Sequence, residues 1–369
     1  MAASRISCDH EIRGVEYDIA VIGGGPAGMA AALSADGQGC SALLIERSHK
    51  LGGILSQCIH SGFGLSYFGE ELTGVEYAAR FAEKINKSYV RVALNTSAVS
   101  MNSDKTIILS GCDGLSDVHP KAVILASGCR ERPIGTLDIA GTRPSGIFTA
   151  GAAQKMINVG GYDIGDRFII LGSGDVGLIM GRQLKQSGKE IVAVIEKEDH
   201  CGGLERNRIG FFEHNDIPLW LRSTISVVHG TERICGVTVR NLETGMEWYA
   251  ECDALITSVG LIPECELSEQ ASDGGRLPEW LFLCGNACYV HDLVDDVAIE
   301  AERLGKIAAQ YVRSGMRKDD LPEARVKHSA NGLFCIACPK ACPLTEIENG
   351  YSGALCGRAA PVPNIVKAS

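Results

Sequence analysis

The chain has 369 residues, of which 45% are hydrophobic, so it is long enough for roughly two to three domains. Its formal net charge of −10 argues against a nucleic-acid partner, because phosphate binding relies on clustered lysine and arginine. No apolar run approaches the roughly 18 to 20 residues of a membrane span. Residues 1–14 are polar and lack the apolar core of a signal peptide. We therefore expect a cytoplasmic protein without a transmembrane segment.

The first motif is a short apolar run that leads into a glycine turn. Residues 17–22 are rich in β-forming side chains, and Gly23, Gly25 and Gly28 follow with the spacing G-x-G-x-x-G. In such a turn the first glycine allows the sharp bend, the second lets the backbone approach a pyrophosphate, and the third lets the helix pack on the strand. The free N–H groups at the start of that helix favour phosphate.

A carboxylate follows the next expected strand. Residues 41–45 are expected to form a strand that leads into Glu46. This position is close to the roughly 20-residue separation at which an acidic residue accepts hydrogen bonds from a ribose 2′-OH. The glycine-rich loop of residues 50–64 comes next and holds Cys58 and His60. Loops at this end of a parallel sheet face the ligand crevice. The two side chains could tune a cofactor or relay protons, but packing within the loop explains them equally well.

A later strand and a second glycine turn extend the pattern. Residues 121–125 are typical of a strand, which ends in Ser127 and Gly128, a shape that lets backbone close over a dinucleotide. Residues 167–171 then lead into a second G-x-G-x-x-G turn, whose helix we expect over residues 178–186. Two complete motifs predict two dinucleotides.

The strand after the second turn again ends in a carboxylate. Residues 191–195 precede Glu196, which would repel a 2′-phosphate, so we favour NADH over NADPH. Further strands are expected near 226–228, 234–239 and 254–256. Two more helices are expected over residues 75–87 and 296–312; the latter has apolar Leu304, Ile307, Ala308 and Tyr311 on one face.

Together these motifs resemble the two-dinucleotide-binding-domain flavoproteins related to thioredoxin reductase. A strand that ends in Gly285 and Asn286 completes the pattern; the family usually carries Gly-Asp here, and Asn286 would keep the hydrogen bond to the flavin's ribityl chain without the charge. The resemblance implies an α/β fold with two Rossmann-like domains, one inserted in the other, and a small C-terminal segment. It implies FAD in the first unit and NAD(H) in the second.

The resemblance and the motifs give the expected boundaries and contact residues. The domains are residues 14–135 and 259–313 for FAD, 136–258 for NAD(H), a linker over 314–330 and a cysteine-rich segment over 331–369. The expected FAD contacts are Gly23, Gly25, Pro26, Ala27, Gly28, Glu46, Gly53, Ser127, Gly128, Gly285 and Asn286. The expected NAD(H) contacts are Gly172, Gly174, Asp175, Val176, Gly177, Glu196 and Gly260.

Within that family, several motifs resemble a flavoprotein found beside glycerol-3-phosphate-dehydrogenase-like subunits and related to subunits of amine, opine and cyanide-forming dehydrogenases. These motifs are residues 52–60, 172–180, 258–263 and 291–295. Between residues 268 and 280 the chain is shorter than the family's usual strands. A disulfide reductase needs a C-x-x-C or C-x-x-x-x-C pair beside the flavin, and neither Cys58 nor any cysteine between residues 133 and 172 supplies one.

The C-terminal segment carries four clustered cysteines. Cys335, Cys338, Cys342 and Cys356 have the spacing C-x2-C-x3-C-x13-C. Such a set can hold an iron–sulfur cluster, and a 4Fe-4S centre is the interpretation we favour because it gives electrons from a flavin somewhere to go. Zinc in a four-cysteine site, or no metal, stays open. The remaining cysteines are scattered and are typical of small buried apolar residues.

These observations predict a cytoplasmic FAD-dependent NAD(P)H oxidoreductase. It would move electrons between NAD(H), FAD and the cluster as part of an oligomer with a dehydrogenase partner, one similar to glycerol-3-phosphate dehydrogenase; that substrate class rests on analogy. The alternatives are a stand-alone NADH oxidase and a zinc-stabilised nucleotide-binding scaffold without turnover.

Overall fold

A computed structural model describes residues 15–212, 216–273, 277–315, 328–329 and 332–333. The chain divides into two compact units: unit 1 is Met1–Cys129 with Pro263–Ser369, and unit 2 is Arg130–Ile262. The expected NAD(H) domain, residues 136–258, lies within unit 2. The chain passes between the units twice, at the short strands β10 (Cys129–Glu131) and β20 (Leu261–Pro263), which pair with each other.

Unit 1 is built on a five-stranded parallel sheet with the order β21-β9-β1-β2-β5. Its strands are β1 (Ile19–Ile22), β2 (Ala42–Ile45), β5 (Arg91–Ala93), β9 (Ala122–Leu125) and β21 (Leu281–Leu283). Every residue of β1, β2 and β9 is buried, as is usual for a parallel sheet covered on both faces. The strand order reverses between β1 and β9, and the carboxyl ends of such a pair are where doubly wound sheets bind ligands.

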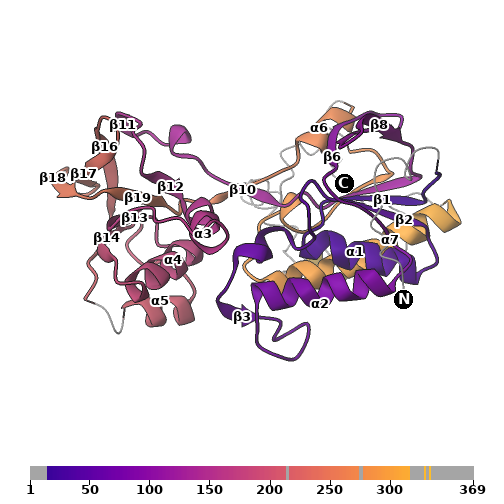
Figure 1. The fold of residues 1–369 in the computed structure, drawn as a ribbon, viewed down its shortest axis with the longest axis horizontal. Helices are drawn as coiled ribbons and strands as arrows, with labels where there is room; N and C mark the ends of the chain where they lie inside the picture. Colours follow the sequence, from indigo (N-terminus) through magenta and orange to yellow (C-terminus); the bar gives the residue numbers. More distant parts are fainter. Residues whose placement is uncertain (1–14, 213–215, 274–276, 316–327, 330–331, 334–369) are drawn as a thin grey trace. The chain divides into compact units, whose positions relative to one another are not determined.

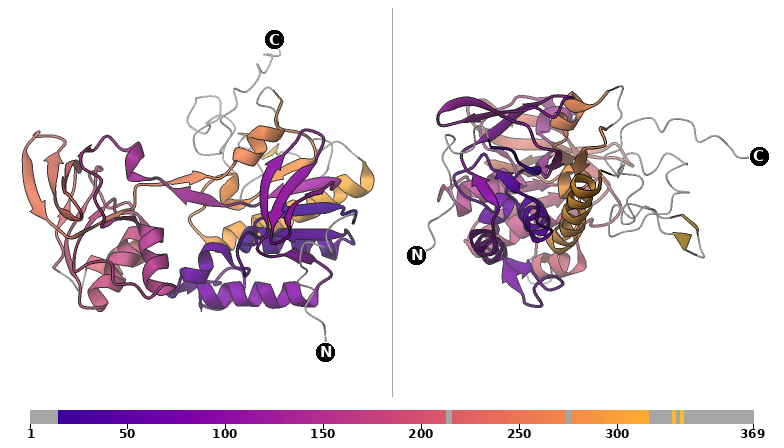
Figure 2. Two further views of the ribbon diagram at one scale, coloured as in Figure 1. Left: turned by 45° about the horizontal axis from the view of Figure 1, so that its top comes forward. Right: turned by 90° about the vertical axis from the view of Figure 1, so that its right-hand side faces the viewer.

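Helices cover one face of this sheet, and a small antiparallel sheet covers the other (Figures 1 and 2). The helices are α1 (Pro26–Gly37), α2 (Gly74–Lys87) and α7 (Val294–Ser314); the small sheet is β6 (Ser97–Met101), β7 (Ile107–Gly111) and β8 (Gly114–Val118). Successive side chains of β1 pack alternately against the helices and against the small sheet. Ile19 and Val21 pack in the core with α1 and α7, and Ala20 and Ile22 pack in the core with the small sheet.

Helices α1 and α7 approach closely because Gly305 has no side chain. A Cβ at this position would lie 2.4 Å from the carbonyl oxygen of Ala31 and 2.8 Å from the Cβ of Ser34. Ser34 also donates a hydrogen bond of 2.6 Å from its hydroxyl to the carbonyl oxygen of Glu302. This contact holds α1, and with it the first glycine turn, against α7.

The remaining elements of unit 1 are short. They are β3 (Ser61–Phe63), β4 (Leu72–Thr73), α6 (Glu266–Ala271), β22 (His328–Ser329), β23 (Gly332–Leu333) and the 3₁₀ turns η2 (Gly53–Gln57) and η4 (Gly285–Ala287). Helix α7 begins earlier than the expected residue 296 and continues through Ser314, which we expected to open a linker. Its left-handed cap at Gly315 ends it one residue later.

Unit 2 repeats the layered design on a second five-stranded parallel sheet, β12-β19-β13-β14-β15. Its strands are β12 (Ile147–Thr149), β13 (Arg167–Leu171), β14 (Glu190–Ile195), β15 (Leu219–Trp220) and β19 (Ala254–Thr257). Helices α3 (Ala150–Asn158), α4 (Asp175–Gln186) and α5 (Glu205–Phe212) pack on one face with Phe168 and Ile170. Helix α4 starts at Asp175 rather than at the expected residue 178, because the glycine turn leads straight into it.

A four-stranded sheet packs on the other face of unit 2, against Ile169 and Leu171. It consists of β11 (Ala140–Gly141), β16 (Ser223–Gly230), β17 (Ile234–Asn241) and β18 (Glu247–Glu251), and the turn η3 (Ile134–Thr136) precedes it. The strand expected near 226–228 is therefore longer than predicted. Within the described ranges no helix combines the length and hydrophobicity needed to cross a membrane.

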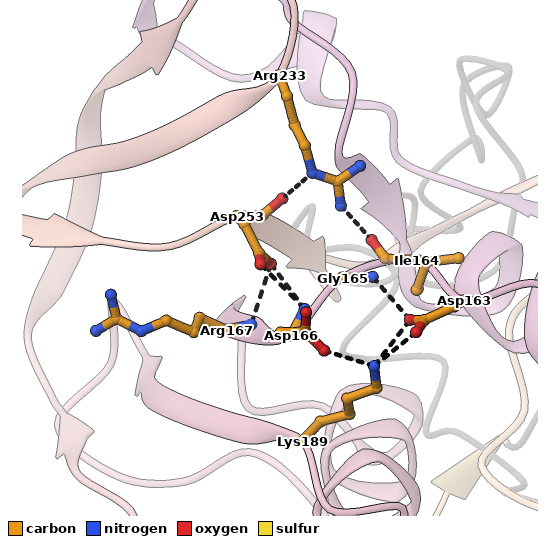
Figure 3. Close-up of polar contacts among 8 residues, drawn as sticks. All are labelled: Asp163, Ile164, Gly165, Asp166, Arg167, Lys189, Arg233 and Asp253. Carbon is orange, nitrogen blue, oxygen red and sulfur yellow. Dashed lines mark hydrogen bonds and ion pairs between the residues drawn. The ribbon is translucent and has the colours of Figure 1, made fainter.

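A polar network fixes the segment that enters β13 (Figure 3). The carboxylate of Asp253 accepts hydrogen bonds from the backbone nitrogens of Asp166 and Arg167, at 2.9 and 3.0 Å. Lys189 contacts the carboxylates of Asp163 and Asp166 at 2.8 and 2.7 Å. The hydrogen bond to Asp163, and to a smaller extent the one to Asp166, raises the pKa of Lys189. These contacts lie at the amino end of β13, opposite the carboxyl end where the glycine turn begins. They therefore stabilise the sheet and take no part in the glycine turn.

Candidate dinucleotide sites

In unit 1, the carboxyl ends of β1 and β9 meet at the first glycine. The backbone nitrogen of Ala126 donates to the carbonyl oxygen of Ile22 at 2.8 Å. Gly23 has a φ of 109°, and a Cβ there would lie 2.3 Å from the carbonyl oxygen of Ala126. Only glycine fits this position, because it tolerates the positive φ and leaves room for the neighbouring strand.

The other two glycines of the turn differ in what surrounds them. A Cβ at Gly28 would lie 1.7 Å from the carbonyl oxygen of Gly23, so this glycine lets α1 pack on β1. A Cβ at Gly25 would meet no atom within 4 Å. Gly25 is the N-cap of α1, Pro26 is its first residue, and the first turn of the helix carries no acidic side chain. The space at Gly25 therefore suits an anion that approaches a helix N-terminus.

Glu46 is buried and fixes the glycine turn. Its Oε2 accepts a hydrogen bond of 2.7 Å from the backbone nitrogen of Gly24, and its Oε1 accepts one of 2.7 Å from the backbone nitrogen of Ser48. A carboxylate has about four acceptor sites, so these two bonds leave capacity for ribose hydroxyls. The residue is 6% exposed and lies where the sequence places the ribose contact.

The loop that carries Cys58 and His60 lies beside the same turn. The backbone nitrogen of Gly52 donates to the carbonyl oxygen of Gly24 at 2.9 Å, and a Cβ at Gly53 would lie 3.0 Å from the Cα of Gly25. Cys58 is buried, its thiol donates to the carbonyl oxygen of Ile54 at 3.5 Å, and burial raises its pKa to about 11. Cys58 is therefore a protonated thiol near pH 7, which is unlike a reactive thiolate.

His60 is half-buried and interacts within its own loop. Its Nδ1 lies 3.0 Å from the carbonyl oxygen of Ser61, and its ring lies 5.0 Å from that of Phe63. These contacts agree with packing in the loop.

Two further segments predicted from the sequence reach the first glycine turn. Ser127 donates a hydrogen bond of 2.5 Å to the carbonyl oxygen of Glu264, and Gly128 has a φ of 79° with open space where a Cβ would be. A Cβ at Gly285 would lie 2.9 Å from the Cβ of Ala27. Asn286 donates from Nδ2 to the sulfur of Cys129 at 3.5 Å. Unit 1 thus gathers the predicted FAD contacts at one edge of its sheet.

The glycine turn of unit 2 is built in the same way around Ser258. Gly172 has a φ of 93°, and a Cβ there would lie 2.2 Å from the carbonyl oxygen of Ser258. Gly174 and Gly177 also face Ser258, whose hydroxyl accepts a hydrogen bond of 3.2 Å from the backbone nitrogen of Gly177. Gly260 follows two residues later with a φ of 104° and open space around it.

Glu196 matches Glu46 in position and in role. Its Oε2 accepts hydrogen bonds from the backbone nitrogen and the hydroxyl of Ser173 at 2.8 and 2.6 Å, and its Oε1 accepts one of 3.1 Å from the backbone nitrogen of Glu198. Burial acts to raise the pKa of Glu196, but the hydrogen bonds from Ser173 and its neighbours outweigh it, and the pKa lies below its ordinary value. The side chain is therefore a carboxylate at neutral pH.

The start of α4 differs from the start of α1 in charge. Asp175 is its first residue, and its Oδ1 accepts hydrogen bonds from the backbone nitrogen of Leu204 and from Asn207, at 2.8 and 2.6 Å. The carboxylate is thus directed to α5 and the loop before it. Val176 packs against the core that α4 shares with β13.

A pocket of about 450 Å³ lies beyond Glu196, between the loop after β14, helix α5 and the segment of β15. It is lined by His200, Cys201, Arg208, Ile209, Phe212, Leu219 and Leu221. A hydrogen bond to Asp199 raises the pKa of His200. Apolar walls with two basic groups at this end of the sheet suit a flat aromatic group joined to anionic or polar substituents.

The four C-terminal cysteines, Cys335, Cys338, Cys342 and Cys356, lie outside the described residues. Among the residues that are described, no group of three or more metal-ligating side chains could hold a metal ion.

The sequence reasoning missed four residues that shape these sites: Ser173, Ser258, His291 and Glu300. Ser173 and Ser258 stand within or directly after the predicted motifs, but their hydroxyl contacts depend on tertiary structure. The sequence does indicate that Glu300 is buried, because it lies four residues before Leu304 on the apolar face of α7. A charge on such a face requires a buried partner, which is His291.

Two glycine turns, each at the switch point of its own parallel sheet and each fixed by a buried carboxylate, define a protein with two dinucleotide-binding domains. Residues 17–275 match the family model described as pyridine nucleotide-disulphide oxidoreductase, and the chain belongs to this family. Membership supports the binding of FAD and of NAD(P) and places the chain among FAD-dependent oxidoreductases that use pyridine nucleotides.

Several curated proteins are similar to this chain. Hydrogen cyanide synthase subunit HcnB of Pseudomonas aeruginosa is 24% identical over 281 residues, which cover 68% of this chain and 58% of that protein. An opine oxidase subunit of Agrobacterium tumefaciens is 27% identical over 197 residues, which cover 49% of this chain and 37% of that protein. The chain therefore spans less than two thirds of the length of either relative.

Solved structures share the fold. The thioredoxin reductase of T. acidophilum has a TM-score of 0.65 at 20% identity, covering 81% of this chain and 98% of that chain. The L-proline dehydrogenase of P. horikoshii has a TM-score of 0.55 at 21% identity, covering 82% of this chain and 56% of that chain. At these identities the likeness shows the fold alone.

Proposed function

We propose that the chain binds FAD in unit 1 and NAD(H) in unit 2, exchanges a hydride between them, and passes electrons on to a dehydrogenase partner subunit. The observation that carries this proposal is the pair of glycine turns at the switch points, each with a buried carboxylate bonded to the turn. One such turn would fit many nucleotide-binding proteins, whereas two in one chain fit a protein that brings two dinucleotides together.

The residues of unit 1 fit FAD. Gly25 would face the pyrophosphate, because its Cβ position is open and α1 begins there. Glu46 would hold the adenosine ribose while it keeps its bonds to Gly24 and Ser48. Gly285 and Asn286 would lie along the ribityl chain. When bound, FAD supplies a group that takes up two electrons and releases them one at a time.

The residues of unit 2 fit NAD(H) better than NADP(H). Glu196 is a carboxylate with its pKa held low, so it would accept hydrogen bonds from ribose hydroxyls and repel a 2′-phosphate. The pocket beyond it, lined by His200 and Arg208, would take the adenine end. Gly172, Gly174 and Gly177 would let the pyrophosphate approach the start of α4.

Cys58 and His60 would act at the FAD site without thiolate chemistry. The raised pKa of Cys58 supports a role as a neutral hydrogen-bond donor, and it does not support a redox disulfide or a nucleophile. His60 is the histidine of this loop, and histidine is a common proton shuttle in proteins.

The onward path of electrons rests on the sequence of the C-terminal segment and on the relatives. We propose that Cys335, Cys338, Cys342 and Cys356 hold an iron–sulfur cluster, with zinc as the alternative. Two relatives are named as subunits, of hydrogen cyanide synthase and of opine oxidase, which supports a partner subunit here. A small polar substrate such as glycerol 3-phosphate for that partner is an analogy.

The proposal is tested with the purified full-length chain. Flavin, iron and zinc are measured, and NADH oxidation is then followed with a one-electron dye and, separately, with oxygen. We expect bound FAD, iron, rapid reduction of the dye and slow reaction with oxygen. Rapid turnover with oxygen alone would favour a stand-alone NADH oxidase, and a colourless protein that contains zinc would favour the scaffold.

A further inference from the structure

A buried ion pair lies directly behind the turn of Gly285 and Asn286. His291 and Glu300 have side chains that are 2% and 3% exposed, and Nε2 of the histidine lies 2.6 Å from Oε2 of the glutamate. The other oxygen of Glu300 accepts a hydrogen bond of 3.2 Å from the backbone nitrogen of Gly285. The pair therefore connects helix α7 to the turn that faces the expected FAD site.

The contacts of His291 fix where its protons lie. Its Nδ1 lies 3.1 Å from the carbonyl oxygen of Tyr289, which can only accept a hydrogen bond. It also lies 3.2 Å from Oδ1 of Asn286. That atom is an oxygen and not the amide nitrogen, because it accepts a hydrogen bond of 3.0 Å from the backbone nitrogen of His291. With two acceptors before it, Nδ1 must carry a proton.

The short contact on the other side of the ring requires a second proton. If Nε2 had no proton and Glu300 were a carboxylate, two lone pairs would face each other at 2.6 Å. One proton must lie between them, on the imidazole or on the carboxyl group. The pair thus holds one proton more than a neutral histidine and a carboxylate would, and its net charge is zero, which lowers the cost of burying it.

This arrangement determines which end of Asn286 a ligand meets. The amide oxygen is occupied by two donors of His291, its backbone nitrogen and Nδ1. The amide nitrogen contacts Cys129, and its second N–H is available to a ligand. An aspartate at this position could only accept hydrogen bonds. The sequence led us to expect that Asn286 keeps that accepted hydrogen bond, but its oxygen is engaged by His291, so the amide offers a ligand a donor instead.

We propose that His291 and Glu300 share one buried proton and, with it, hold the Asn286 amide so that it donates a hydrogen bond to the bound ligand. The ligand group that faces Asn286 is then an acceptor that has no proton to donate, such as a carbonyl or phosphate oxygen of FAD. His291 and Glu300 are positioning residues, and Asn286 is the residue that touches the ligand. The ligand part of this inference rests on the proposed FAD site, whereas the shared proton does not.

The shared proton is tested in the full chain without added cofactor. The histidines are labelled with ¹⁵N, and the His291 signals are assigned by their loss in His291→Gln. We expect a proton on Nδ1, with Nε2 either protonated or accepting a strong hydrogen bond. A ring protonated on Nε2 alone would overturn the inference, whether or not the protein binds FAD.

The direction of the Asn286 hydrogen bond is tested with Asn286→Asp. Aspartate can accept both hydrogen bonds from His291, so the thermal midpoint of the FAD-free variant should not fall. Its Kd for FAD should rise at least tenfold, because the donor to the ligand is lost. The matched control is Asn102→Asp, which adds the same charge on an exposed turn and should leave FAD binding unchanged. FAD binding by Asn286→Asp as tight as that of the parent chain would contradict the donor assignment, and absence of FAD from the parent chain would instead contradict the proposed function.

Discussion

The carboxylate of Glu196 accepts a hydrogen bond of 2.6 Å from the hydroxyl of Ser173, the second residue of the glycine turn in unit 2. A second bond, of 2.8 Å, comes from the backbone nitrogen of the same residue. Glu46 makes the equivalent backbone contact with Gly24 in unit 1. In both units the acid that would bind a ribose also fixes the loop that would bind the phosphates.

This double role leads to a prediction about nucleotide preference. Changing Glu196 to Ala and Lys197 to Arg removes the repulsion of a 2′-phosphate and leaves the basic groups of the neighbouring pocket. We expect the ratio of flavin reduction rates, NADH over NADPH, to fall by about tenfold to a hundredfold, the range for a hydrogen bond to a charged group. Lys197→Arg alone is the control: it keeps the Glu196 carboxylate and its contacts with Ser173, so the ratio should stay the same. A parent chain that already prefers NADPH would show that Glu196 does not set the preference.

Two glycines of the first turn should respond differently to the same substitution. Gly25→Val places a side chain in open space, so the protein should fold with its normal helix content but contain no FAD. Gly28→Val places a side chain on the carbonyl oxygen of Gly23 and should prevent folding of unit 1. Circular dichroism and flavin content distinguish the two outcomes. A Gly25→Val protein fully loaded with FAD would refute the assignment of the pyrophosphate to this position.

The buried thiol of Cys58 should make stability depend on pH above about pH 9. Burial raises its pKa to about 11 from an ordinary value of 9.0, so the unfolded chain ionises first and stability falls as the pH rises through this window. The loss is roughly 2 to 3 kcal/mol when complete. Cys58→Ser keeps a donor for the carbonyl of Ile54 but does not ionise there.

We therefore expect the urea midpoint of the parent chain to drop more between about pH 8 and about pH 10.5 than that of Cys58→Ser. Below about pH 9 both proteins should show the same pH dependence. Equal drops in the two proteins would mean that the Cys58 thiol is not shielded from solvent.

Contact between α1 and α7 should be sensitive to a single methyl group. Gly305→Ala would place a Cβ 2.4 Å from the carbonyl oxygen of Ala31, and the forced separation of the helices should cost about 1 to 3 kcal/mol. Gly37→Ala in α1, where a Cβ meets no atom within 4 Å, is the matched control and should be neutral or slightly stabilising. Thermal midpoints measured with both proteins would decide, and an unchanged midpoint in Gly305→Ala would show that the helices can separate without cost.

The parts of the fold that the sequence predicted are those with strong local signals. The sequence predicted both glycine turns and the strands before them, because glycine spacing and apolar runs are local patterns. It also predicted the acidic residues that follow β2 and β14. The apolar face predicted for α7 is confirmed, because Ile307 and Ala308 are buried in the core with α1.

The parts that the sequence did not predict depend on tertiary contacts. Helix α3 consists largely of small residues, and β15 has two residues, so neither shows a clear period. Strands β6 and β8 have mixed exposure along their length and gain order by pairing with β7. The contact between His291 and Glu300 could not be predicted from the sequence, because the course of the chain between the two residues is not specified by a local pattern.

The C-terminal cysteines carry the prediction for onward electron transfer. Serine is a poor substitute for a soft thiolate ligand, so Cys342→Ser should lose iron and the broad absorbance near about 400 nm of thiolate-bound clusters. FAD should stay, and dye reduction should fall sharply. Cys112→Ser, which changes an exposed free thiol, should keep both cofactors. Unchanged iron content and dye reduction in Cys342→Ser would remove Cys342 from the ligand set.

The central claim is that this chain itself transfers a hydride between NAD(H) and FAD. An anaerobic titration of the purified chain with NADH, followed at the flavin absorbance, tests it most directly. We predict that about one equivalent of NADH per FAD bleaches the flavin, with NADPH reacting more slowly at equal concentration. A chain that holds FAD but is not bleached by either nucleotide would contradict the claim.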